Sequence, residues 1–369
     1  MNNTLRELIA ALPIPTIFEE VKVETKIAEN IALMKELNPT WNPIESDSNM
    51  MQIEAFSYKE VMLINTFNNA IKKMLPHYCE NEDLDNFIFG FYAGETRLQG
   101  SYPSASYEFE LEEALSVNII IPKGLQLSDG NTHTAYLDEN VTISVGELKA
   151  TGKVKLELKE KTSDVKTETV ISPYPYVIKV TSKEEFKGGS SVENDVEFFE
   201  RAILSLYKYS TAGGEKAYIY HAKSADERVF DVKIISPAPR LITVAVLVND
   251  ADIQSEVIAV VNERLNGNEK IQAFDDVVTV EAAVAKDITR AATIHIFDLT
   301  KQAEITDKIA QNMKDVFKIG EAFPNSQLIK LLHVSGVYKV VLDSVEDMTV
   351  LPNEYIKLTI NKTFVEAVL

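Results

Sequence analysis

The five histidines are the first residues of this 369-residue chain that could hold a metal ion or carry a proton. None lies three or four residues from another, and no His-Glu-x-x-His motif places two ligands on one helical face. Ordinary surface or hydrogen-bonded histidines are therefore expected, with no metal ion and no other cofactor. The five are His77, His133, His221, His295 and His333.

The sequence also lacks a recognisable motif for a catalytic nucleophile. The single cysteine, Cys79, follows His77 by two residues, and side chains at that spacing near a helix end point to different faces. Ser190 and Ser191 lack the Gly-x-Ser-x-Gly turn that exposes a nucleophile, and the two Gly-Gly pairs lack phosphate-loop spacing. No catalytic residue is predicted, and the chain is not expected to be an enzyme.

Charge narrows the classes of partner. The formal net charge is −19, and no cluster of Lys and Arg larger than Lys72-Lys73 appears. Nucleic acid and anionic membrane surfaces are therefore disfavoured as partners. The longest aliphatic run, Leu241 to Val248, is far shorter than the roughly 20 residues of a membrane helix. No signal peptide is recognisable and one cysteine forms no internal disulfide, so synthesis in a cytoplasm is expected.

The first hundred residues show helical periodicity. Apolar residues recur every three or four positions before Pro13, again up to Leu37, and then along a long helix from about Ser48 to Leu75. Three such stripes joined by proline-rich links cannot all be buried against one another, so part of the long helix is expected to face a partner helix. The candidate interface residues are Phe56, Ile64, Phe67 and Ile71.

The remainder changes from period-two alternation to mixed α/β patterns. Tyr107, Phe109 and Leu111 alternate with polar residues, as expected for a small antiparallel β domain. Two β-α-β cycles follow, which suggests two small split sheets of the ferredoxin-like type. The predicted fold class is a multidomain α+β protein. The predicted domains are a helical segment (1–98), a β domain (99–190), an α/β domain (191–285) and a C-terminal α/β domain (286–369).

Several short motifs carry a family resemblance. The block from Glu200 to Gly214, followed by His221-Ala222 and then Ser236-Pro237-Ala238-Pro239, resembles the signature of baseplate J-like proteins. This family comes from contractile-tailed phages, R-type pyocins and related injection systems. The matches keep the family's order along nearly the whole chain, although Ser48 stands where a proline usually follows the aspartate. The others include Leu12-Pro13-Ile14-Pro15, Asp83-Leu84-Asp85, Ile121-Pro122-Lys123-Gly124, His333-Val334-Ser335-Gly336-Val337 and Leu351-Pro352-Asn353-Glu354-Tyr355.

The resemblance implies a structural role in a tail baseplate. Family members form wedges around a central spike, and the wedges close into a six-fold ring that holds the start of the sheath. The implied partners are copies of this chain, a smaller wedge subunit, a sheath-initiator protein and the central hub or spike proteins. The implied location is the baseplate of a virion or injection system, after assembly in the bacterial cytoplasm. The family supplies no catalytic residues.

Two other functions are considered. A receptor- or glycan-binding tail protein would need an exposed aromatic platform, whereas the predicted β domain has few aromatic residues. A cytoplasmic hydrolase would need a catalytic constellation that the motifs do not provide. The isolated chain is expected to be a monomer or to self-associate weakly, and to form a defined complex with the smaller wedge subunit.

Overall fold

A computed structural model gives the architecture of the chain, which divides into two compact units. One unit comprises the described residues of Met1–Arg97 and Asn194–Ser205, and the other those of Leu98–Glu193 and Leu206–Leu369. The structure describes residues 21–367 except 43, 45–46, 77, 93, 163, 177, 211–213, 249, 268–270, 272–275 and 314–315. The first predicted helix, before Pro13, lies outside this range.

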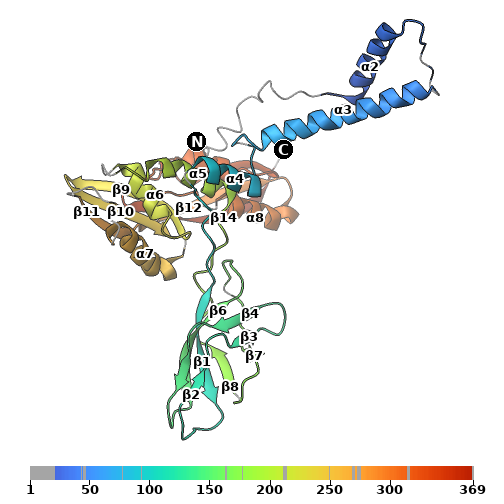
Figure 1. Ribbon diagram of the computed structural model, residues 1–369. Coiled ribbons are helices and arrows are strands. Elements are labelled where there is room, and N and C mark those ends of the chain that lie inside the picture. Colours follow the sequence, from blue (N-terminus) through green and yellow to red (C-terminus); the bar gives the residue numbers. More distant parts are fainter. Residues whose placement is uncertain are drawn as a thin grey trace. The chain divides into compact units, whose positions relative to one another are not determined.

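The first unit is helical, as the periodicity predicted. It contains α2 (Val23–Leu37), α3 (Ser48–Lys72), α4 (Asn81–Phe91) and α5 (Asp195–Leu204) (Figure 1). The long helix begins at the predicted residue and ends three residues before Leu75, in turns that precede Pro76. A proline disfavours helical geometry in the residue before it, which accounts for the earlier end.

The core of this unit lies where α4 meets α5. Leu84, Ile88, Phe198 and Phe199 are buried there with Cys79, whose thiol donates to backbone carbonyls. A capping box at Asn194 begins α5, because its side chain accepts from the backbone and Glu197 reaches back.

Two arginines hold the segment that follows α4. Buried Arg201 pairs with Glu95 at 3.0 Å and donates to the Thr96 carbonyl, while Arg97 pairs with Asp85 and Asp195. Burial lowers the pKa of Arg97, but its hydrogen bonds to Asp195 and Asp85 outweigh that effect and raise it above the usual value. The charged groups therefore tie α5, distant in sequence, to α4.

The second unit begins with the predicted antiparallel β domain. Its six-stranded sheet has the order β7-β3-β4-β6-β1-β8, and a two-stranded sheet joins β2 to β5. All of these pairs are antiparallel. The strands are β1 (Ser104–Leu111), β2 (Ile119–Ile121), β3 (Gln126–Ser128), β4 (Thr134–Leu137), β5 (Val141–Ile143), β6 (Lys149–Leu156), β7 (Thr169–Val170) and β8 (Ile178–Ser182).

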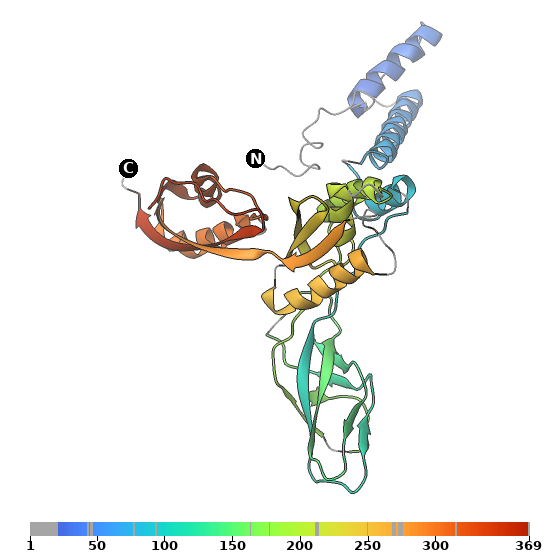
Figure 2. The same cartoon turned by 90° about the vertical axis from the view of Figure 1, so that its left-hand side faces the viewer.

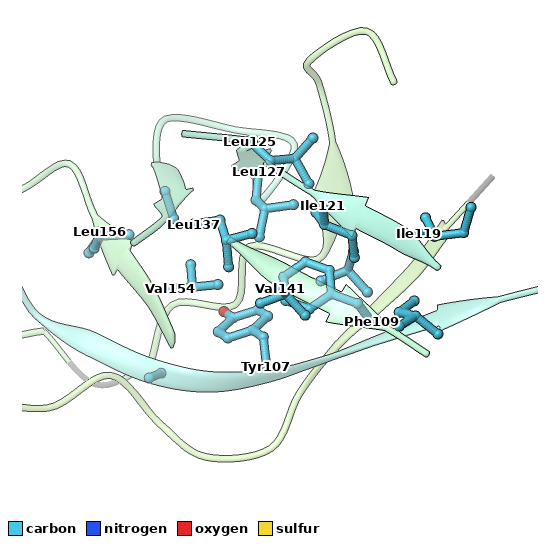
Figure 3. Close-up of a cluster of buried hydrophobic side chains, with 14 of the residues drawn as sticks. Tyr107, Phe109, Ile119, Ile121, Leu125, Leu127, Leu137, Val141, Val154 and Leu156 are labelled. Atoms are coloured by element: carbon cyan, nitrogen blue, oxygen red, sulfur yellow. The ribbon is translucent and has the colours of Figure 1, made fainter. Parts of the chain in front are cut away.

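The β domain has a dense core. Alternate residues of β1, including Tyr107 and Phe109, point inward and meet aliphatic side chains from β2 to β6 (Figure 3). Packing is tight enough that β6 requires glycine at position 152, where a Cβ would come within 2.3 Å of Val141. The Tyr107 hydroxyl is also satisfied, lying 3.2 Å from the Thr167 hydroxyl. This alternation confirms the period-two prediction.

An α/β subdomain follows, built from α6 (Glu215–Lys223), β9 (Val229–Ala238), β10 (Leu241–Val248), α7 (Gln254–Asn266) and β11 (Val277–Ala282). In its sheet, β10 pairs with β9 antiparallel and with β11 parallel. Strand β9 continues through Ser236 and Pro237 to Ala238. Pro237 is tolerated because β9 is an edge strand with a register shift at this point.

The C-terminal subdomain is built on β12 (Val284–Ile296), β13 (Val337–Leu342) and β14 (Glu354–Glu366), with α8 (Gln302–Asn312) and α9 (Asn325–Leu332) between β12 and β13. Strand β12 lies between the other two, antiparallel to β13 and parallel to β14. Short 3₁₀ turns occur at Ser205–Tyr207, Ala251–Ile253 and Leu299–Lys301. Figure 2 shows β12 and β14 as long strands, orange to red.

The α+β class and the multidomain plan are confirmed, with two separate mixed sheets in the last part of the chain. Each of these sheets has three strands in β-β-α-β or β-α-α-β-β order, whereas a complete ferredoxin-like domain has four. The predicted boundaries at 98, 190 and 285 stay a prediction. No described helix is long and apolar enough to cross a membrane.

Candidate assembly surface

Helices α2 and α3 form an antiparallel hairpin held by few contacts. Asn30 donates through Nδ2 to the Ser57 hydroxyl at 2.9 Å, and Lys26 lies 3.5 Å from a Glu60 carboxylate oxygen. These pairs place the start of α2 near Ile64, so the last two turns of α3 extend beyond it. The hydrogen bond and the ion pair both lie along one side of α3.

The start of α3 is well defined. Asp47 is the N-cap and accepts from the Asn49 backbone N–H at 3.0 Å. Its second carboxylate oxygen accepts from the indole N–H of Trp41 at 2.7 Å. The negative charge of the Asp47 carboxylate also interacts favourably with the positive end of the helix dipole, which stabilises the helix. Asp47 is therefore the residue that caps α3.

Very little of the hairpin is buried. On α3 only Ser57 and Val61 are buried, and no residue of α2 is. Isolated helices gain most of their stability in proteins from the packing of an apolar face. The α2–α3 hairpin fully buries only Ser57 and Val61 of its two helices, so it gains little stability from such packing.

The exposed sides of α3 are instead strongly apolar. Phe56, Leu63 and Phe67 are 64%, 59% and 68% exposed, and Met74 beyond the helix end is 70% exposed. Exposed side chains on a second side of the helix are Met51, Tyr58 and Met62. Single exposed hydrophobic residues are ordinary, but two rows on one helix indicate an interaction surface.

The four predicted interface residues separate into two pairs. Phe56 and Phe67 are exposed, as a partner-facing position requires. Ile64 and Ile71 are half-buried and lie closer to the side of Ser57 and Val61. The structure does not contain a partner, so the role of all four as an interface stays a proposal.

Sequence reasoning missed Leu63, although a signal was present. Phe56, Leu63, Phe67 and Met74 are spaced by seven, four and seven residues. Together with Ile53 and Ala70 they fill all but one of the a and d positions over three heptads, the spacing that packs one helix against another. The exception is Glu60, which instead bonds within the hairpin. We call Phe56, Leu63, Phe67 and Met74 the heptad stripe.

Among the described residues, histidines and acidic residues do not gather into a metal-binding cluster. No cluster of three or more metal-ligating side chains occurs among the residues that the structure describes. His221 is buried in α6, with Nε2 at 3.2 Å from the Lys208 carbonyl. His133 lies 2.8 Å from Asp129 in a turn, and His333 contacts the Tyr338 carbonyl. His77 lies outside the described residues.

Comparison with known proteins gives one sequence relative. The chain is 31% identical over 157 residues to baseplate protein J of Escherichia phage P2. This match confirms the resemblance to the baseplate J-like family. It covers 41% of this chain and 52% of the relative, so the chain spans about half the length of the baseplate protein it matches. No family model matches the chain.

A solved structure is also similar across nearly the whole chain. It is the cryo-EM structure of the anti-feeding prophage baseplate, six-fold symmetrised, with a TM-score of 0.44 and 13% identity. The alignment covers 96% of this chain and 97% of that one.

Proposed function

We propose that this chain is a structural subunit of the baseplate of a contractile tail or injection system. In this role the hairpin of α2 and α3 docks through the heptad stripe against helices of neighbouring subunits. The observation that carries the proposal is the imbalance of the hairpin, which buries only Ser57 and Val61 while large apolar side chains on α3 stay exposed. The 31% identity to baseplate protein J supplies the context.

The physical reason is the cost of leaving the stripe in water. Burying a Phe, Leu or Met side chain contributes about 1.5–3 kcal/mol each, so the stripe would supply a substantial part of the free energy of an interface. Helices with a and d positions filled in this way pack into bundles by inserting each side chain between those of the partner. A bundle of hairpins from several subunits would bury both apolar rows of α3.

The proposed partners follow from the family. They are copies of this chain, a smaller wedge subunit, a sheath-initiator protein and the central hub or spike proteins. In this arrangement the subunits form wedges that close into a ring around the spike, after assembly in the bacterial cytoplasm. The proposed role is positional, with no catalytic residue, cofactor, nucleic acid or membrane involved.

Co-expression with the smaller wedge subunit tests the proposal. Phe56→Asp and Phe67→Asp place a charge on exposed positions, so both variants should fold and yet fail to form the complex on size exclusion and in native mass spectrometry. Ile64→Asp changes a half-buried position next to the hairpin contact and should loosen the hairpin itself.

Thr66→Asp is the matched control. Thr66 is exposed on the same helix and lies between the two apolar rows. This variant should assemble nearly as well as the parent chain. The proposal fails if Phe56→Asp and Phe67→Asp assemble normally, or if the unmodified chain forms no complex with either the wedge subunit or the sheath initiator.

A further inference from the structure

Strand β14 has one hydrogen-bonding edge without a partner strand. Among the described residues it lies at the end of its sheet and pairs only with β12. The Val284 N–H donates to the Asn353 carbonyl, so odd-numbered residues of this strand direct their peptide groups toward β12. The peptide groups of Ile356, Leu358, Ile360 and Lys362 therefore point away from it. Within the described residues, the backbone hydrogen bonds to this edge are both at Glu354, whose carbonyl accepts from the Gly320 N–H and whose N–H donates to the Leu351 carbonyl.

An apolar groove runs along the same edge. It has a volume of about 480 Å³, with residues 355–362 of β14 along its length. Phe230 and Leu247 form one wall from the preceding sheet, and Met313 and Phe317 form the other. A free strand edge beside an apolar groove is the arrangement in which an extended segment adds to a sheet, with backbone hydrogen bonds for affinity and side chains in the groove for selectivity.

We propose that the segment Pro13–Glu20 of a second copy of this chain occupies this edge as an added strand. The segment lies outside the described residues, and its sequence, Pro-Ile-Pro-Thr-Ile-Phe-Glu-Glu, fits the edge in two independent ways. The two features are the positions of the prolines and the acidic end of the segment, and the heptad stripe of α3 has neither. The proposal stands apart from the docking of the hairpin.

The first fit is the parity of the prolines. Residues two apart in a strand direct their peptide groups to the same edge, and Pro13 and Pro15 both lie at odd positions. Both prolines therefore share one edge of the added strand. In the pairing register that we propose, this edge faces away from β14, where a strand tolerates the missing N–H groups of proline. Ile14, Thr16 and Phe18 keep complete peptide groups for pairing. The prolines would also prevent a further strand from adding to the new edge.

The second fit is charge. The groove is lined by Lys357 and Lys362, and neither forms an ion pair with any residue that the structure describes. The apolar part of the segment ends in Glu19 and Glu20. In a chain with a net charge of −19, two lysines beside an apolar groove would select an acidic extended segment.

Sedimentation and peptide binding test this proposal on the full chain. The chain should self-associate weakly, and a synthetic peptide of residues 12–22 should bind it and suppress that association. A second peptide exchanges two residues, Pro15→Thr with Thr16→Pro, which preserves composition and charge but moves a missing N–H to the pairing edge. It should bind roughly tenfold more weakly, as expected when a backbone hydrogen bond is lost.

Charge variants give a second, independent readout. Lys357→Glu with Lys362→Glu should weaken binding of the peptide about fivefold or more, and a peptide with Glu19→Lys and Glu20→Lys should restore it. Lys339→Glu, exposed on the opposite edge strand β13, is the control and should bind the original peptide normally.

Three results would overturn the proposal. They are equal binding of the two proline peptides, no binding of the original peptide, and a chain that is monomeric at every concentration. These results test only the edge of β14 and leave the proposed docking of the hairpin untouched. Conversely, Phe67→Asp changes the hairpin and should leave self-association through β14 unchanged. A failure here is therefore distinguishable from a failure of the proposed baseplate assembly.

Discussion

The β domain and the α2–α3 hairpin place their large apolar side chains in opposite ways. In the β domain the large side chains point inward, and Tyr107, Phe109 and Leu137 are fully buried. In the hairpin, Phe56 and Phe67 face outward over a contact that buries Ser57 and Val61. A small domain with a dense core is complete by itself, whereas a helical pair without one is stable only when something else covers it.

This difference separates two kinds of variant. Substitutions in the β domain should lower the stability of the isolated chain. Substitutions in the heptad stripe should leave that stability unchanged and act on assembly. The predictions below run from the largest expected change in unfolding free energy to the smallest.

Phe109→Ala should destabilise the β domain by about 3–5 kcal/mol, because it removes a fully buried ring and leaves a cavity. Hydrogen exchange of the amides in β1 and β6 would measure the loss. Glu112→Ala, exposed just after β1, is the matched control and should change stability by less than about 0.5 kcal/mol. A small effect of Phe109→Ala would mean that the β domain is not the self-sufficient region of the pair.

Arg201→Met should cost about 3 kcal/mol in the first unit, because it leaves the buried Glu95 carboxylate without its arginine. Thermal unfolding followed by circular dichroism would report the change. Replacing both residues by leucine should recover much of the loss, since the cost comes from an uncompensated charge rather than from a missing attraction. Equal losses in the single and double variants would contradict this account of the pair.

Ser57→Ala should cost only about 1 kcal/mol. It removes the hydroxyl that accepts from Asn30, one of the few side-chain contacts between α2 and α3. Hydrogen exchange of the α2 amides would detect the loosened hairpin. A loss as large as that of Phe109→Ala would show that the hairpin is more tightly packed than its burial suggests.

Phe67→Asp should change the stability of the isolated chain by less than about 0.5 kcal/mol, because the ring is already 68% exposed. Urea unfolding of the isolated chain would measure this, with Thr66→Asp as the matched variant. Cooperative unfolding caused by Phe67→Asp alone would place its ring in an internal core and remove it from the proposed interface.

Local patterns were sufficient for much of the fold and insufficient for the surface. The start of α3 at Ser48 and the strand Val337–Leu342 could be predicted because a capping aspartate and a compact β-branched run mark them. The full lengths of β12 and β14 could not, since their polar halves, such as Lys286-Asp287 and Asn361-Lys362, lack a continuous apolar pattern. Pairing over thirteen registered positions compensates for that lack.

The candidate surface shows the same limit. The sequence could predict that Phe56, Ile64, Phe67 and Ile71 lie in one sector of a helix. It could not predict which of them α2 leaves exposed, because that depends on the register between the helices and on the shorter length of α2. The structure places Phe56 and Phe67 outside that contact, and the heptad spacing then adds Leu63 to them.

Hydrogen exchange along α3, in the isolated chain and in its complex with the wedge subunit, tests the central claim most directly. Amides of fully packed helices exchange slowly, and those of helices with little burial exchange quickly. The account predicts fast exchange of the amides from Ile53 to Ala70 in the isolated chain, strong protection of the same amides in the complex, and no such protection with Phe67→Asp. Strong protection in the isolated chain, unchanged on assembly, would show that the hairpin is already complete and would contradict the account.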